Sequence, residues 1–152
     1  METETQISRN REAVVQFSVF TPNRLGRLYD LVRLLSARNV QVLGMTVLDT
    51  TDSAIVRFMV DDPDKARMLL DEEKFPFTES VLVVVEVAAA DELSRLMSAL
   101  LEAELNINYL YSFIPHPNGK SLLGLSLEDN EMAEKVLKRH QFRVLRQSDI
   151  LR

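Results

Sequence analysis

The sequence of 152 residues has no cysteine, two histidines and four glycines. Without cysteine the protein has no disulfide bonds, no catalytic thiolate and none of the usual sulfur ligands of a zinc site. The histidines, His116 and His140, have no acid or nucleophile at the spacing of a catalytic motif, and we expect a turn residue and a cation near a helix C-terminus. The sequence also lacks a Walker-type glycine-rich loop and a dinucleotide fingerprint. We therefore expect no catalytic residue, no metal site and no cofactor.

Basic residues are outnumbered, because 18 Lys and Arg stand against 23 Asp and Glu, a net charge of -5. Nucleic-acid phosphates bind to a basic face, so this balance argues against nucleic acid as the main partner. The longest unbroken apolar runs, such as Val81–Val85, are too short to cross a membrane. Residues 1–11 are polar and have no apolar core of a signal peptide. We therefore expect a cytoplasmic protein with no membrane partner.

Apolar residues follow strand and helix periods in turn along the chain. A valine- and phenylalanine-rich strand is expected at Val14–Phe20, followed by a helix at about Leu25–Arg38, whose leucines recur every three or four residues. The further expected elements are strands at 40–48, 54–60 and 81–87, with a lead-in at 75–80, a helix from 62 to about 74, a hairpin of 107–114 and 121–128, a helix at 131–140 and a last strand at 143–150.

Two dipeptides give the strongest local signals. Asp62-Pro63 predicts a helix start, with an Asp cap and a proline at the first helical position. Asn118-Gly119 is typical of a hairpin turn. Nearby Asp61 and Asp64 suggest a metal site together with Asp62, but capping and solvation explain these acids more simply.

The same order of elements occurs twice. Leu28 in the first helix corresponds to Leu93, at a shift of 65 residues. After the longer second hairpin turn the shift becomes 67, as from Phe75 to Phe142. A repeat of this length indicates two copies of one supersecondary unit.

Each copy has the order β-α-β-β-α-β of the ferredoxin-like fold. We therefore predict an α+β fold of two ferredoxin-like βαββαβ modules in tandem, at residues 12–79 and 80–152, with antiparallel sheets and helices on one face. The other face of each sheet has no helices, and a small open sheet with apolar residues is usually covered by a partner. We therefore expect at least a homodimer.

The stretch Pro22–Leu28 joins the first strand to the first helix and contains Asn23 and Gly26. Such a turn directs free backbone N–H groups and the positive end of the helix dipole at one small volume, where a carboxylate or phosphate is stabilised. The alternative is that Asn23 caps the helix and Gly26 relieves crowding. The local pattern alone favours this alternative.

Three segments carry a family resemblance. Val19–Leu28 resembles the first-strand and loop motif of ACT domains, small regulatory modules that bind amino acids. Leu35–Val42 is similar to the helix end and second strand that follow in that family, and Leu105–Phe113 resembles the same stretch in tandem ACT proteins. The resemblance extends over residues 14–151. It implies a regulatory protein that binds a small amino acid, and not an enzyme.

The resemblance also implies where the ligand binds. In ACT domains the amino acid typically lies where the first loop of one module meets a neighbouring module, and a ligand-facing Asn often begins the second strand. Leu25 replaces a proline that the family often has before the loop glycine. Side-chain amides suit both ends of an amino acid, since they donate and accept hydrogen bonds. The implied ligand-binding residues are Asn23, Arg24, Leu25, Gly26, Gln41 and Asn106.

The second module departs from the family pattern at its loop. At the shift of 65, Ala88 replaces Asn23 and Asp91 replaces Gly26, and Glu92 follows. The two acids are expected to cap the next helix, but they place negative charge where a carboxylate ligand would lie. We therefore expect the first loop to bind and the second to be structural, with Asn106 of the second module reaching a ligand at a neighbouring first loop.

Three other functions stay open. The first half also resembles the N-terminal module of the acetolactate synthase small subunit, which implies a regulatory subunit with a biosynthetic enzyme as partner. An enzyme would be revealed by turnover, and a nucleic-acid binder by a salt-dependent shift with RNA or DNA. Tyr109, Tyr111 and Phe113 share one face of a strand and could stack on bases, but the acidic balance favours core packing.

Overall fold

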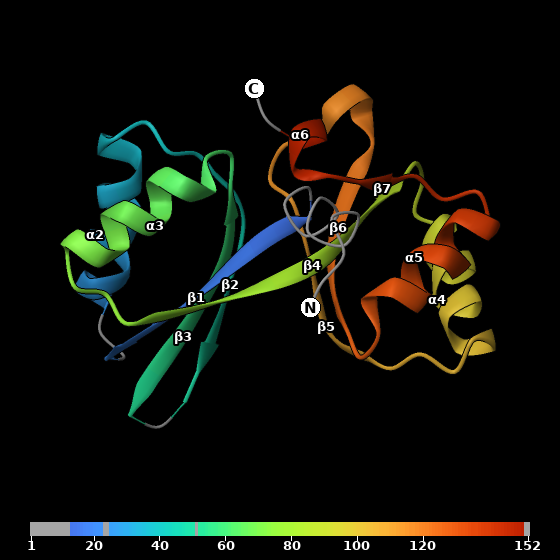
Figure 1. Ribbon diagram of the computed structural model, residues 1–152, viewed down its shortest axis with the longest axis horizontal. Coiled ribbons are helices and arrows are strands. Elements are labelled where there is room, and N and C mark those ends of the chain that lie inside the picture. The colour runs from blue at the N-terminus through green and yellow to red at the C-terminus, as the bar shows by residue number, and fades with distance from the viewer. Residues whose placement is uncertain (1–12, 23–24, 51, 151–152) are drawn as a thin grey trace, which may run out of the picture. The chain divides into compact units, whose positions relative to one another are not determined.

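The computed structural model describes residues 13–22, 25–50 and 52–150 (Figure 1). These residues form two compact units, whose main bodies we call the first module (residues 15–80) and the second module (residues 81–150). Both have the element order β-α-β-β-α-β, so the predicted α+β fold of two ferredoxin-like modules is confirmed. None of the helices in the described ranges is both long and apolar enough to cross a bilayer.

The first module places two helices, α2 and α3, side by side on one face of its sheet (Figure 1). The strand order is β2-β3-β1-β4, and β3 pairs antiparallel with both β1 and β2. The elements are β1 (Val14–Pro22), α2 (Leu25–Ala37), β2 (Val42–Asp49), β3 (Ser53–Val60), α3 (Pro63–Glu72) and the first part of β4 (Phe77–Val87).

Aromatic rings form the centre of the first core. Phe17 on β1 is fully buried, stacks on Phe58 of β3 with ring centroids 5.6 Å apart, and meets Phe77 edge-on at 5.8 Å. Because successive strand residues point to opposite faces, alternate residues of β1 and β3 contact the helices. Leu31 of α2 and Leu69 of α3 pack against them. Burying each such side chain contributes about 1.5–3 kcal/mol, which holds both helices on the sheet.

The second module repeats this arrangement around a mainly aliphatic core of valines and leucines, with one aromatic ring, Phe142. Strand β6 pairs antiparallel with β4 and β5, and β7 pairs with β4. The elements after β4 are α4 (Glu92–Glu102), β5 (Ile107–Ser112), the short turn η1 (Pro117–Gly119), β6 (Ser121–Leu127), α5 (Asn130–Arg139), β7 (Val144–Leu145) and α6 (Gln147–Ile150).

Strand β4 contributes to both modules. The sequence predicts only a lead-in at residues 75–80, but the strand already begins at Phe77. Within the first module the Gln16 side chain donates from Nε2 to Ser80 Oγ at 3.0 Å, which ties this segment to β1. The apolar pattern does not reveal these residues because most of them are polar. Residues 77–80 thus close the first module, and 81–87 open the second.

The predicted last strand at residues 143–150 is wrong for most of its length. Strand β7 has two residues, and the chain then forms the short helix α6. The Arg146 N–H donates to Asp149 Oδ2 at 2.7 Å, and the Asp149 N–H donates to the Arg146 carbonyl at 2.9 Å. An acid at the third helical position that reaches back in this way favours a helical turn over a strand.

Candidate functional site

The turn before α2 is the first candidate loop. Asn23 and Arg24 lie outside the described residues, and α2 begins at Leu25. The first turn of α2 has no acidic residue. A Cβ added at Gly26 would meet nothing within 4 Å, so the alternative that Gly26 relieves crowding is wrong. The described part of this loop therefore combines open space at a glycine with the positive end of a helix.

Arg27 is the basic side chain next to this glycine. Its guanidinium lies over the Phe75 ring, 4.4 Å from the centroid, and its Nη1 is 3.8 Å from Asp30 Oδ2. A cation over an aromatic face is attracted by the ring quadrupole. The positive charge is thus anchored one residue after Gly26.

In the second module a carboxylate of the protein itself fills the corresponding loop. The Ala88 N–H donates to Glu92 Oε2 at 2.7 Å. Asp91 makes no side-chain capping hydrogen bond, so the prediction that both acids cap α4 is wrong for Asp91. The helix dipole favours a carboxylate at the start of a helix, and here this carboxylate also accepts a backbone N–H of the preceding loop. Glu92 therefore satisfies a loop N–H that an external anion would need.

Arg95 holds this carboxylate from the other side. Its Nη2 is 3.5 Å from Glu92 Oε1, its Nη1 donates to the His140 carbonyl at 2.6 Å, and its guanidinium lies 3.9 Å from the Phe142 ring centroid. In the second loop a chain of contacts thus runs from the Ala88 N–H to the Glu92 carboxylate and on to the Arg95 guanidinium.

The two loops also differ in length. Val83 of β4 is equivalent to Phe17 of β1, a shift of 66 residues. Both side chains belong to the core under the helices, and Phe17 pairs with Phe58 of β3 as Val83 pairs with Leu125 of β6. The buried leucines of the helices keep the shift of 65. The second loop therefore has one residue fewer than the first. If the strands are aligned, Asn23 corresponds to Ala89. If the helices are aligned, it corresponds to Ala88.

The two predicted amide residues occupy equivalent positions before β2 and β5, and each is held by an acid. Asp61 Oδ1 accepts the Gln41 N–H at 2.8 Å, and the Asp61 N–H donates to the Gln41 carbonyl at 3.1 Å. The Asn106 side chain donates from Nδ2 to Glu128 Oε2 at 3.1 Å, and the Glu128 N–H donates to the Asn106 carbonyl at 3.2 Å. These contacts fix the backbone where each strand begins.

Within one module the structure does not bring these amides to the loop. Gly26 lies in the first turn of α2, whereas Gln41 follows the other end of this helix, where the Val40 N–H donates to the Leu35 carbonyl. A helix of 13 residues is about 20 Å long. In the second module α4 separates its loop from Asn106 in the same way. Within each module the loop and the amide residue therefore lie at opposite ends of a helix.

A model of the ACT domain pair family matches residues 12–152. The chain belongs to this family. ACT domains are regulatory ligand-binding modules, and the family assignment agrees with the resemblance of the loop and strand segments. No curated protein matches the chain.

Solved structures share the fold of this ACT pair. A protein from Bacteroides thetaiotaomicron is 26% identical, with a TM-score of 0.83 over 92% of this chain and 96% of that one. The regulatory subunit of aspartate kinase from Thermus thermophilus is 14% identical, with a TM-score of 0.59 over 84% of this chain and 91% of its own. The subunit from Thermus flavus is 15% identical, with a TM-score of 0.60 over 86% and 92%. The latter two show similarity of fold alone.

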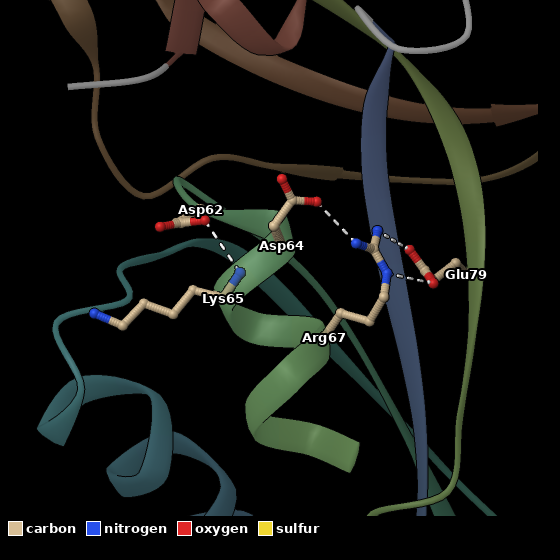
Figure 2. Close-up of polar contacts among 5 residues, drawn as sticks. All are labelled: Asp62, Asp64, Lys65, Arg67 and Glu79. Carbon is tan, nitrogen blue, oxygen red and sulfur yellow. Dashed lines mark hydrogen bonds and ion pairs between the residues drawn. The ribbon is translucent and has the colours of Figure 1, made fainter. Parts of the chain in front are cut away.

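Away from the loops, the first ACT module has a charged cluster between α3 and β4 that the sequence analysis did not predict (Figure 2). Arg67 donates from Nε to Glu79 Oε2 at 2.9 Å, and Nη2 binds the other oxygen at 2.5 Å. Its Nη1 also donates to Asp64 Oδ1 at 2.9 Å. The bond to Glu79 is the main reason that the pKa of Arg67 is raised. Each nitrogen of this guanidinium thus binds an acid of the protein, which indicates a structural role for the cluster.

In the second ACT module a single acid joins three segments. Glu86 on β4 lies 3.0 Å from Lys120 Nζ and 3.0 Å from Arg143 Nη1. Burial raises the pKa of Glu86, but the bonds to Lys120 and Arg143 together outweigh it, so the pKa is lowered below its ordinary value of 4.5. Glu86 therefore stays ionised between its two cations.

The acids near α3 have separate partners. Asp62 caps α3 by accepting the Lys65 N–H at 3.1 Å, as predicted, and Asp61 and Asp64 bind Gln41 and Arg67. Within the described ranges no three His, Cys, Asp or Glu side chains are placed to hold a metal ion.

The three aromatic residues considered for base stacking lie in or directly after β5. Tyr111 and Phe113 are buried, and the Tyr111 ring stacks with that of Tyr109.

Proposed function

We propose that this ACT pair is a sensor that binds one small amino acid per chain at its first loop and transmits binding through a subunit contact. The loop N–H groups donate hydrogen bonds to the α-carboxylate of the ligand, and the oxygen of a side-chain amide from a neighbouring module accepts from its ammonium group. The residues of this site are Asn23, Arg24, Leu25 and Gly26, with Gln41 or Asn106 from the neighbour.

The contrast between the two loops carries this proposal. At the start of α4 the protein supplies its own carboxylate, Glu92, to the Ala88 N–H. At the start of α2 no acid stands in the first turn, and the space at Gly26 is open. A helix start without an internal acid favours an external anion.

The energies favour one site per chain. A ligand carboxylate at the second loop must displace Glu92, and losing a hydrogen bond to a charged group costs about 1.5–3 kcal/mol. Repulsion from Asp91 at the same helix start adds about 0.3–1 kcal/mol. The second loop should therefore bind an amino acid about 20-fold to several hundredfold more weakly than the first.

The ligand is identified by a thermal-shift screen of the twenty amino acids. A ligand at about 100 times its dissociation constant should stabilise the fold by about 2.7 kcal/mol. Calorimetry with the best ligand should then give one site per chain, lost in Asn23→Ala and kept in Asp91→Ala. Asp91 is a matched control because it is exposed and makes no capping hydrogen bond. Two equal sites per chain, or binding indifferent to Asn23, would contradict the assignment.

Gly26→Ala separates binding from folding. A Cβ at this position meets no neighbour, and alanine is about 1 kcal/mol better than glycine inside a helix, so the variant should be at least as stable as the wild type. If the ligand approaches the backbone at Gly26, its affinity should fall about tenfold or more. A variant that is stable and binds with unchanged affinity would place the ligand elsewhere.

The assembly has two candidate forms. The helices of each module cover one face of its sheet, and a small open face with apolar residues is usually covered by a partner, so we expect at least a homodimer. Light scattering at micromolar concentration should exclude a monomer of 17.4 kDa. The alternative is a regulatory subunit of a separate biosynthetic enzyme, such as a relative of the acetolactate synthase small subunit. An affinity pull-down from native lysate that recovers one enzyme in stoichiometric amount would favour that alternative.

A further inference from the structure

Two ion pairs join the second helix of each module to the segment that closes its sheet. In the first module these are Arg67 of α3 and Glu79 of β4 (Figure 2). In the second module Arg146, directly after β7, donates from Nη1 and Nη2 to the two carboxylate oxygens of Glu134 in α5, at 3.1 and 3.0 Å. Both pairs are bidentate, the strongest and most directional form of this contact.

The two pairs occupy equivalent positions with opposite polarity. A shift of 67 residues takes Arg67 to Glu134 and Glu79 to Arg146. The N-caps of the two helices support this alignment, because Asp62 and the equivalent Asp129 each accept the backbone N–H three residues further on. The helix supplies the cation in the first module and the anion in the second.

Opposite polarity separates correct from incorrect pairing. If the segment that carries Arg146 docked on α3, Arg146 would face Arg67. If the segment that carries Glu79 docked on α5, Glu79 would face Glu134. Docking on the wrong helix therefore brings two like charges together, where docking on the correct helix forms a bidentate ion pair. We propose that these four residues form a charge code that keeps the closing segment of each module from docking on the other module of a second copy of the chain.

The second closing segment is the one that most needs this code. It covers residues 143–150 and contributes only two residues to the sheet. Chains built from similar repeats misassemble when an element of one repeat takes the place of its counterpart. During folding, before residues 77–80 have paired with β1, the edge of β1 in another chain is open to such an exchange.

Two single variants give a matched test in the full chain. Glu134→Arg and Arg146→Glu both break the correct pair and leave two like charges facing each other. Each also creates an attractive wrong pair, between the new side chain and Arg67 or Glu79 of another copy. Glu134→Gln and Arg146→Gln are the matched controls, because they break the correct pair without creating an attractive wrong one. After rapid dilution from denaturant, the fraction of oligomers with exchanged segments should be about three- to tenfold higher for the two charge reversals than for these controls. Size-exclusion chromatography with light scattering measures this fraction.

The double variant Glu134→Arg/Arg146→Glu restores the correct pair but gives both modules the same polarity. Its denaturation midpoint should return toward that of the wild type, while its misassembled fraction stays above the wild-type value. The reversal Glu131→Lys/Lys135→Glu, which exchanges an exposed pair along α5, controls for charge changes alone and should refold like the wild type. Charge reversals that misassemble no more than Glu134→Gln and Arg146→Gln, or a double variant that refolds as cleanly as the wild type, would overturn the proposal.

Discussion

The two ACT modules share an order of strands and helices but differ in how the polar groups at the ends of these elements are paired. At the first loop Arg27 is turned onto Phe75 and the helix start has no acid, whereas at the second loop Glu92 binds the backbone and Arg95 binds Glu92. The repeated apolar pattern sets the common fold, while the side chains at the loops differ. A pair of similar modules can thus differ at equivalent loops without a change of architecture.

Buried and exposed aromatic residues of the first module should respond differently to mutation, and this is the largest effect we expect. Phe17→Ala removes a fully buried ring that contacts Phe58 and Phe77, so the free energy of unfolding should fall by about 3–5 kcal/mol. Phe20→Ala, on the same strand but 40% exposed, should cost about 1 kcal/mol or less. Equilibrium denaturation measures both. Similar losses in the two variants would show that the aromatic cluster is not the centre of the first core.

A smaller difference should separate the two arginines that lie over rings. Arg27→Ala loses a cation–π contact at a partly exposed site, about 0.5–1 kcal/mol. Arg95→Ala also loses the hydrogen bond to the His140 carbonyl and its contact with Glu92, so it should cost about 1–2 kcal/mol. Arg95→Lys keeps the charge but not the planar fork and should lie between them. If Arg27→Ala is the more destabilising variant, the second loop is less tightly closed than its contacts indicate.

The smallest expected effect is a pH dependence that comes from Glu86. Because its folded pKa is lowered below 4.5, Glu86 stabilises the protein fully above that pH and loses this contribution as the pH falls below it. The free energy of unfolding of Glu86→Gln should therefore fall less than that of the wild type between about pH 5 and pH 3. Lys120→Met, which removes one of the two cations, should give an intermediate slope. If the free energy of unfolding falls equally with decreasing pH in the wild type and in Glu86→Gln, this role is contradicted.

Local signals in the sequence predict most of the fold. The shift from a period of two to a period of 3.6 marks each change from strand to helix. Asp62 caps α3 as its place before a proline predicts, and Asn118 and Gly119 both have the positive φ, 57° and 74°, that their turn signal predicts. Each of these signals depends on residues that are close in the sequence, which is why they can be read without a structure.

The features that the sequence analysis missed depend on contacts between distant residues or on a single residue of register. The one-residue difference between the loops is visible only from the strand pairing of Phe17 and Val83. The Arg67–Glu79 pair joins a helix to a strand, and no periodic pattern predicts it. Of the predicted site residues, Gly26, Gln41 and Asn106 have a described environment, and the binding roles of these and of Asn23, Arg24 and Leu25 stay predictions.

Strand β4 has a consequence for how the protein can be divided. Residues 77–80 complete the first module and residues 81–87 begin the second, within one uninterrupted strand. A fragment cut at this boundary would end in a four-residue strand, and chain ends of this kind fray. Separate halves should therefore overlap, with residues 77–87 present in both.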